Sequence, residues 1–241
     1  MDRLIYTSMA GAKASLQRQD VLANNLANAS TNGFRAELAA FRAVPVQGSG
    51  ASTRVAAIET TIGYSTEAGP VQSTGRPLDV ALKGKSWLSV QGLDGTEAYT
   101  RAGALEVNAE GMLVTASGLP VVGDGGPITV PPNSTVEIAA DGTVTARAGN
   151  GRPTNLGRLK LVTPEGPLTR GTDGLFRGAD GDLAADPAAR VQSGALEGSN
   201  VSPVETMVSM IAAARQFEHH MKLLQGAEQR EQSAAKLLTS Q

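Results

Sequence analysis

The chain has 241 residues with a net charge of −2 and no cysteine, and 3% of its residues are aromatic. The lack of thiols excludes disulfides, thiolate metal sites and a cysteine nucleophile, and the near-neutral charge argues against a nucleic-acid interface. No stretch reaches the roughly 18 apolar residues of a membrane span, so membrane insertion is not expected. Lys13, Arg18 and Asp20 interrupt the region where a secretory signal would lie, so no cleaved signal peptide is expected either.

The N-terminal segment, residues 1–35, predicts a helix that ends in a turn. It holds one Gly and no Pro before a turn-forming cluster at 28–33. Its seam residues recur at steps of four and three, which is the spacing of a helix that packs along another helix. The members of this seam are Ile5, Met9, Ala12, Leu16, Gln19, Ala23 and Leu26.

The middle of the chain predicts strands. Residues 36–75 show no clear period and include Gly48-Ser49-Gly50, which favours an extended connector. From 76 to 190 we expect an all-β domain, because short β-type runs alternate with Asp-Gly turn signals. These Asp-Gly pairs lie at 94–95, 124–125, 141–142, 173–174 and 180–181, and the third predicts a hairpin between 135–138 and 143–145.

The C-terminal segment, residues 191–241, predicts a second and longer helix. Ser202 is placed to cap it and Pro203 suits its first position, and the pattern runs on to about Leu238. Its seam consists of Met210, Ala214, Phe217, Met221 and Leu224. The fold class that follows is α+β, with long N- and C-terminal helices packed as an antiparallel coiled-coil pair and an all-β middle domain of many short strands.

Two groupings resemble nucleotide or calcium sites, and each lacks a required residue. Gly84-Lys85-Ser86 copies the end of a phosphate-binding loop, but Asp79 stands where that loop needs a glycine. A calcium loop starting at Asp180 would need Gly and Glu where the chain has Ala185 and Val191. Both groupings are better interpreted as turns.

Other catalytic chemistry finds little support. His219 and His220 are neighbours, so on a helix they point about 100° apart and cannot share a metal ion. Paired carboxylates of a carbohydrate-active enzyme stay open as an alternative, although such sites usually use aromatic platforms. We therefore expect no catalytic residues, no metal, no cofactor and no enzyme.

The long helices indicate assembly. A helix from 203 to 238 spans about 54 Å at 1.5 Å per residue, more than a domain of this size can cover. Its apolar face is therefore expected to meet protein partners. The alternative is a β-domain binding module whose helices form a discrete dimer.

Three motifs resemble those of the bacterial flagellar rod, hook and hook-associated proteins. The first is the run from Val21 to Asn28, followed by Ser30 to Arg35. The second joins Arg76–Leu82 and Trp87 to Tyr99-Thr100-Arg101-Ala102-Gly103, and the third runs from Gly198 to Ile211. The chain departs from common family members at Lys85-Ser86-Trp87-Leu88, where acidic-Gly-Phe-Phe is more usual. The opening Met1–Met9 and the length resemble the proximal-rod members, with distal-rod and hook paralogues as the alternative.

The resemblance implies a structural subunit of the periplasmic rod that transmits motor torque. It implies export through the flagellar export apparatus without a cleaved signal peptide, and partners that are other rod proteins and copies of the same chain. The terminal helices would form the assembly interface. From the residues themselves we expect the amides of Asn24, Asn25 and Asn28 to serve neighbouring subunits, and the alternative is that they are surface asparagines that end the helix. The expected interface residues are Ile5, Met9, Leu16, Asn24, Asn25, Leu26, Asn28, Val204, Met207, Met210, Ile211, Phe217, Met221 and Leu224.

Overall fold

The computed structural model describes residues 2–45, 55–149, 151–179 and 181–239. The chain forms two compact units. The helical unit takes residues 1–29, 36–65 and 201–241, and the β unit takes residues 30–35 and 66–200. Each unit therefore uses segments that are far apart in the sequence.

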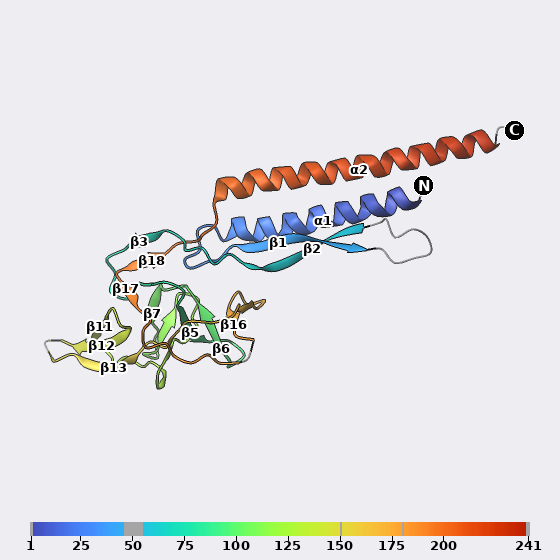
Figure 1. Ribbon diagram of the computed structural model, residues 1–241. Helices are drawn as coiled ribbons and strands as arrows, with labels where there is room; N and C mark the ends of the chain where they lie inside the picture. Colours follow the sequence, from blue (N-terminus) through green and yellow to red (C-terminus); the bar gives the residue numbers. More distant parts are fainter. Residues whose placement is uncertain (1, 46–54, 150, 180, 240–241) are drawn as a thin grey trace. The chain divides into compact units, whose positions relative to one another are not determined.

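Two long helices and one hairpin build the helical unit. Helix α1 (Asp2–Ala27) and helix α2 (Pro203–Thr239) lie side by side and antiparallel, as expected (Figure 1). Strands β1 (Glu37–Pro45) and β2 (Val55–Tyr64) pair antiparallel and lie along α1 (Figure 1). None of the described helices is long and apolar enough to cross a membrane.

The buried side of α1 matches the expected seam only in part. Ala12 is buried and Gln19 and Leu26 are half-buried, as expected. Met9, Leu16 and Ala23 are exposed, whereas Ser8, Ser15 and Leu22 are buried or half-buried in their place. A Cβ on Gly11 would lie 2.4 Å from the His220 ring, so the imidazole of this α2 residue lies directly over Gly11. Glycine and serine carry no hydrophobic signal, whereas the expected seam follows large apolar residues.

Helix α2 shows the same half-correct seam. Met210, Phe217 and Leu224 are half-buried as expected, whereas Met221 is exposed. Buried Ala213 and half-buried His220 lie on the contact side instead. Large apolar side chains of both helices are consequently left at the surface.

The segment expected to be an extended connector contains the β1–β2 hairpin. Its period was hard to see because β1 is rich in small residues, with the sequence Glu-Leu-Ala-Ala-Phe-Arg-Ala-Val-Pro. A register shift between Leu38 and Ala39 further breaks the alternation. The Gly48-Ser49-Gly50 stretch lies outside the described residues.

The β unit is built from sixteen described strands, all short and all paired antiparallel. A five-stranded sheet has the order β14-β5-β6-β16-β15, a three-stranded sheet has the order β11-β12-β13, and the other strands pair in twos. In chain order the strands are β3 (Val71–Ser73), β4 (Val80–Leu82), β5 (Trp87–Gln91), β6 (Glu97–Thr100), β7 (Leu105–Val107), β8 (Leu113–Thr115), β9 (Val122–Gly123), β10 (Gly126–Pro127), β11 (Ser134–Ile138), β12 (Thr143–Ala148), β13 (Thr154–Arg158), β14 (Leu161–Val162), β15 (Thr169–Arg170), β16 (Phe176–Arg177), β17 (Val191–Ser193) and β18 (Ala195–Glu197).

The Asp-Gly signals mark the hairpins of this unit. Four of the five pairs connect neighbouring strands, namely β5–β6, β9–β10, β11–β12 and β15–β16. Gly142 has a φ of 89°, which explains why glycine follows Asp141 at the β11–β12 turn. The fifth pair includes residue 180, which lies outside the described residues.

An aliphatic core fills the β unit, as its low aromatic content predicted. Fully buried side chains come from most of its strands, and Val80, Leu88, Leu105 and Val191 are each completely inaccessible. The single Trp, Trp87, is buried and stacks obliquely on Phe176 with ring centroids 4.6 Å apart. This tryptophan is therefore a natural reporter of the folded β unit.

Candidate assembly surfaces

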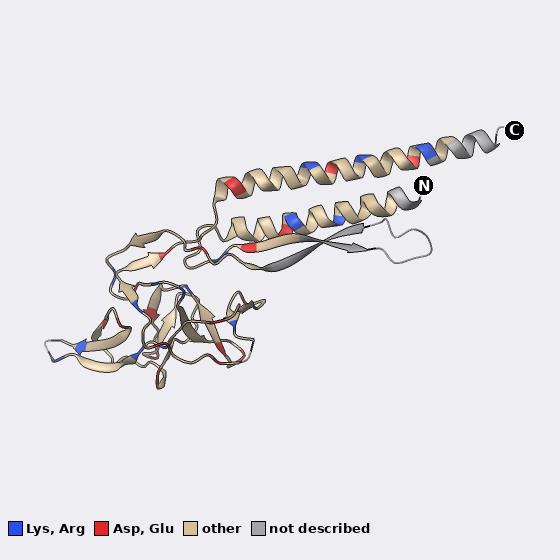
Figure 2. Cartoon of the chain, viewed as in Figure 1, with Lys and Arg blue, Asp and Glu red and all other residues tan. Residues whose placement is uncertain are grey.

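An apolar stripe is exposed on the first turns of α2. Val204, Met207, Val208 and Ile211 occupy positions i, i+3, i+4 and i+7, and are 72%, 51%, 61% and 56% exposed. No charged residue lies between Glu205 and Arg215, so this part of the helix appears uncharged in Figure 2. We call these four residues the α2 stripe, which is an unusual amount of exposed apolar surface for one helix face.

Helix α1 also exposes large side chains. Tyr6, Met9 and Leu16 are exposed by 67%, 55% and 44%. Met9 and Leu16 are two turns apart, so both lie along one side of the helix. They belong to the expected interface but not to the contact with α2, which leaves them accessible to another molecule.

The expected interface residues thus fall into three groups. Ile5, Leu26, Asn28, Met210, Phe217 and Leu224 are half-buried within the chain. Met9, Leu16, Asn24, Val204, Met207, Ile211 and Met221 are exposed. Sequence reasoning missed Tyr6, Val208 and Leu223, which are also exposed. The spacing of Val208 after Val204 was a usable signal that the search for a single seam overlooked.

Asn25 is the one expected interface residue that is buried, with 6% exposure. Its Nδ2 donates to the carbonyl oxygen of Glu37 at 2.9 Å, and its Oδ1 accepts from the Glu37 N–H at 2.8 Å. Both polar atoms of this amide therefore bind β1 of the same chain, and a contact with a neighbouring subunit stays a prediction. Asn28 Nδ2 likewise donates locally, to the carbonyl oxygen of Asn24 at 3.0 Å.

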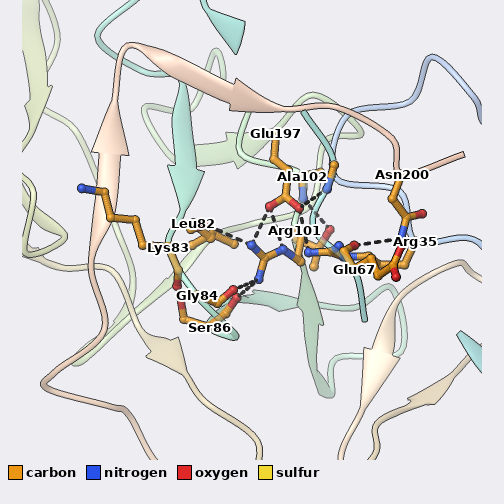
Figure 3. Close-up of polar contacts among 12 residues, drawn as sticks. Arg35, Glu67, Leu82, Lys83, Gly84, Ser86, Arg101, Ala102, Glu197 and Asn200 are labelled. Carbon is orange, nitrogen blue, oxygen red and sulfur yellow. Dashed lines mark hydrogen bonds and ion pairs between the residues drawn. The ribbon is translucent and has the colours of Figure 1, made fainter. Parts of the chain in front are cut away.

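A buried ion network lies where the chain enters and leaves the β unit (Figure 3). Glu197 Oε1 accepts from Arg35 Nη2 at 2.7 Å and from the Gly69 N–H at 3.1 Å. Glu197 Oε2 accepts from Arg101 Nε at 2.8 Å. Arg35, Arg101 and Glu197 are each at most 3% exposed. We call Arg35, Gly69, Arg101 and Glu197 the Glu197 network.

Backbone carbonyl groups complete the network. Arg101 donates from Nη1 to the carbonyl oxygens of Gly84 and Ser86, and from Nη2 to that of Leu82 (Figure 3). The sequence that resembled a phosphate-binding loop is therefore a turn that presents its carbonyl oxygens to an arginine. Arg101 Nη2 also donates to Glu197 Oε2, so the two arginines donate six bonds that compensate for the burial of one carboxylate and its partners.

The backbone of Gly33 packs directly against the Glu197 network. The Gly33 N–H donates to the Glu197 carbonyl oxygen at 2.7 Å. Gly33 has a φ of 71°, and a Cβ there would lie 2.2 Å from the backbone carbon of Arg101, so only glycine fits. Each of the three family-like motifs contributes to this small region or adjoins it. Sequence reasoning quoted Arg35 and Arg101 in those motifs but could not pair residues 96 and 162 positions from Glu197.

The groupings weighed for metal binding have other uses. No cluster of three or more potential metal-ligating side chains occurs among the described residues. Arg177 donates to Asp173 at 2.7 Å, and this bond lowers the pKa of the Asp173 carboxyl. Asp186 accepts from Thr163 Oγ1 at 2.6 Å, which lowers its pKa in the same way. His219 is exposed, whereas His220 packs over Gly11.

Three family models match this chain. They are the Flagella basal body rod protein at residues 5–35, the Flagellar hook protein FlgE/F/G D1 domain at 81–146, and the Flagellar basal body rod FlgEFG protein C-terminal at 192–237.

Similar proteins cover the whole chain. The flagellar basal-body rod protein FlgF of Salmonella typhimurium is 50% identical over 99% of both chains, and that of Escherichia coli is 47% identical over 99% of both. The rod protein FlgG of Agrobacterium fabrum is 31% identical, over 94% of this chain and 96% of its own. The higher identity to FlgF favours the proximal-rod assignment over the distal-rod and hook alternatives. The chain therefore belongs to the FlgF family of flagellar basal-body rod proteins.

Proposed function

We propose that this structural subunit builds the rod by packing the α2 stripe and the exposed side of α1 against other subunits. The partners are copies of the same chain and other rod proteins. The observation that carries the proposal is the α2 stripe, whose four large apolar residues are more than half exposed in the single chain. Burying them in an assembly would gain about 25 cal/mol for each Å² of apolar area removed from water.

The arrangement suits a rod rather than a closed dimer. The exposed side chains of α1 and those of α2 are different surfaces, so one subunit can bind a neighbour with each. Contacts between unlike surfaces are heterologous, and they repeat in one direction along a helical assembly. Torque would then be carried by many such contacts acting in parallel.

Export is the second part of the proposal. We propose that the chain travels unfolded through the flagellar export apparatus, without a cleaved signal peptide, and folds in the periplasm. A chain with no cysteine cannot be trapped by disulfides before passage. Long helices that gain most of their stability from packing would also form fully only when partners are present.

The test is a charge placed in the α2 stripe. Val208→Glu should abolish incorporation into rods and swimming in a strain that lacks the native gene, because a carboxylate would be buried at the subunit contact. Gln225→Glu is the matched control, since it adds the same charge to an exposed position of α2 outside the stripe. Circular dichroism of both purified variants should equal that of the parent chain. Normal rods with Val208→Glu would overturn the proposed role of the stripe.

A further inference from the structure

The chain crosses between its two units four times, and three segments of the β unit contain these crossings. They are residues 30–35, 66–70 and 197–200. The first leads from α1 into the hairpin, the second follows β2, and the third leads into α2. The Glu197 network takes one member from each of these segments, together with Arg101 from the β-unit core.

The bonds are distributed so that one carboxylate joins all three segments. Glu197 itself belongs to the third segment and binds the first through Arg35 at 2.7 Å and the second through the Gly69 N–H at 3.1 Å. Asn200 adds a bond from Nδ2 to the Glu67 carbonyl oxygen at 2.9 Å and one from its N–H to the Phe34 carbonyl oxygen at 3.3 Å (Figure 3). Arg101 fixes the carboxylate to the turn that follows β4.

A buried ion pair is a poor way to gain stability, because apolar replacements are often equally stable. What the Glu197 network supplies is a defined geometry, since a planar guanidinium and a carboxylate meet in few orientations. The residues it joins are 162 positions apart, a separation that a disulfide would bridge in a chain with cysteines.

We infer that the Glu197 network holds the C-terminal end of α1, the base of the β1–β2 hairpin and the N-terminal end of α2 together while the helices themselves are unpaired; we call these three places the attachment points. Helix α1 with its hairpin and helix α2 then leave the β unit close to one another. Joining the attachment points through a few residues keeps the effective concentration of α1 for α2 high, in the millimolar range typical of short links. Glu197 is a positioning residue for helix pairing and makes no contact with a neighbouring subunit.

The test measures the distance between the attachment points of α1 and α2 in the full chain. Cysteines introduced at the exposed positions Ser30 and Val204 are the only thiols, so spin labels report one distance. Ala12→Glu with Ala213→Glu places two charges at positions that are 6% and 2% exposed, and should unpair the helices. A loss of helical circular dichroism confirms the unpairing.

In this unpaired background the distance distribution should stay narrow. Adding Arg35→Met should broaden it and shift its mean to longer distances, because the first segment is released. Adding Lys160→Met is the matched control, since it removes another β-unit ion pair, with Glu97 at 2.7 Å, and should leave the distribution narrow. Trp87 fluorescence reports whether the β unit remains folded in each variant.

Two results would overturn the inference. One is a broad distribution in the unpaired background with the Glu197 network intact, and the other is a narrow distribution after Arg35→Met in a folded β unit. If Arg35→Met unfolds the β unit, Asn200→Ala replaces it, since it removes the side-chain bond to the Glu67 carbonyl oxygen that joins the third segment to the second. This milder change should widen the distribution partly, and no widening at all would count against the inference.

Discussion

Asn25 shows how a side chain can have a role within its own chain that the sequence alone does not suggest. Three asparagines near the end of one helix suggested contacts between subunits, because an apolar seam does not need them. The amide of Asn25 instead binds both backbone groups of Glu37. Its partner lies 12 positions away, in a hairpin that had no clear sequence signature.

Replacing Asn25 should therefore weaken the subunit itself. Asn25→Ala removes two part-buried hydrogen bonds to the backbone of Glu37, which together contribute about 1–3 kcal/mol to the unfolding free energy of the helical unit. Asn24→Ala is the control, because Asn24 is exposed on the same turn. Denaturant unfolding followed by helical circular dichroism measures the difference. Equal stability of the two variants would show that the Glu37 bonds contribute nothing.

Tyr99 makes the β unit sensitive to alkali. Burial raises the pKa of its phenol to about 12 from the ordinary 10.0, and its hydroxyl oxygen accepts from the Leu183 N–H at 2.6 Å. The unfolded chain loses this proton near pH 10 while the folded chain keeps it, so rising pH favours unfolding. The stabilising contribution is complete below pH 10 and is lost by about pH 12.

The measurement is urea unfolding followed by Trp87 fluorescence at pH 9 and pH 11.5, two values chosen on either side of the ordinary tyrosine pKa. Tyr99→Phe should start less stable, because the Leu183 N–H loses its acceptor, and should lose less stability between the two pH values. Parallel losses in parent and variant would mean that other groups cause the alkaline dependence.

At the scale of elements, glycine decides how closely the helices pack. Gly11 and Gly226 both lie inside helices, but a Cβ would lie 2.4 Å from the His220 ring at Gly11 and meets nothing within 4 Å at Gly226. Gly226→Ala should stabilise the helical unit by about 0.5–1 kcal/mol through helix propensity alone. Gly11→Ala has the same propensity gain but must displace the imidazole.

We therefore expect opposite shifts in the thermal midpoint of helical circular dichroism. Gly226→Ala should raise it and Gly11→Ala should lower it. The two substitutions are chemically identical, so their difference isolates the contact with His220. A rise of the same size for both would mean that α1 and α2 are not closely packed at this point.

Periodicity and turn chemistry predicted the elements better than their contacts. The helices, the aliphatic β body and the hairpin at Asp141-Gly142 follow from local patterns that the structure confirms. The helix seam was only half correct because small polar residues such as Ser8 and Ser15 are buried on α1, which hydrophobicity does not reveal. The Glu197 network could not be found at all, since pairing over 96 and 162 positions leaves no local trace.

At the scale of the whole molecule, the division into two units predicts what a truncation does. Removing residues 1–30 deletes α1 but leaves Arg35 and the rest of the Glu197 network in place. The β unit should keep its Trp87 melting transition, whereas α2 should lose helicity because its partner helix is gone. The truncated chain should not enter rods. Rod incorporation at the parent level would refute the role proposed for α1.

The bond between Asn25 and Glu37 has a mechanical consequence for the assembled rod. An amide that binds both backbone groups of one residue acts as a strand one residue long, placed beside the first residue of β1. Turning α1 about its axis by one residue would carry the amide away by about 100° and break both bonds. The rotational setting of α1 decides whether Met9 and Leu16 face outward, and the two bonds to Glu37 oppose a change in that setting. In an assembled rod we expect torsion on α1 to be passed to the hairpin through these bonds.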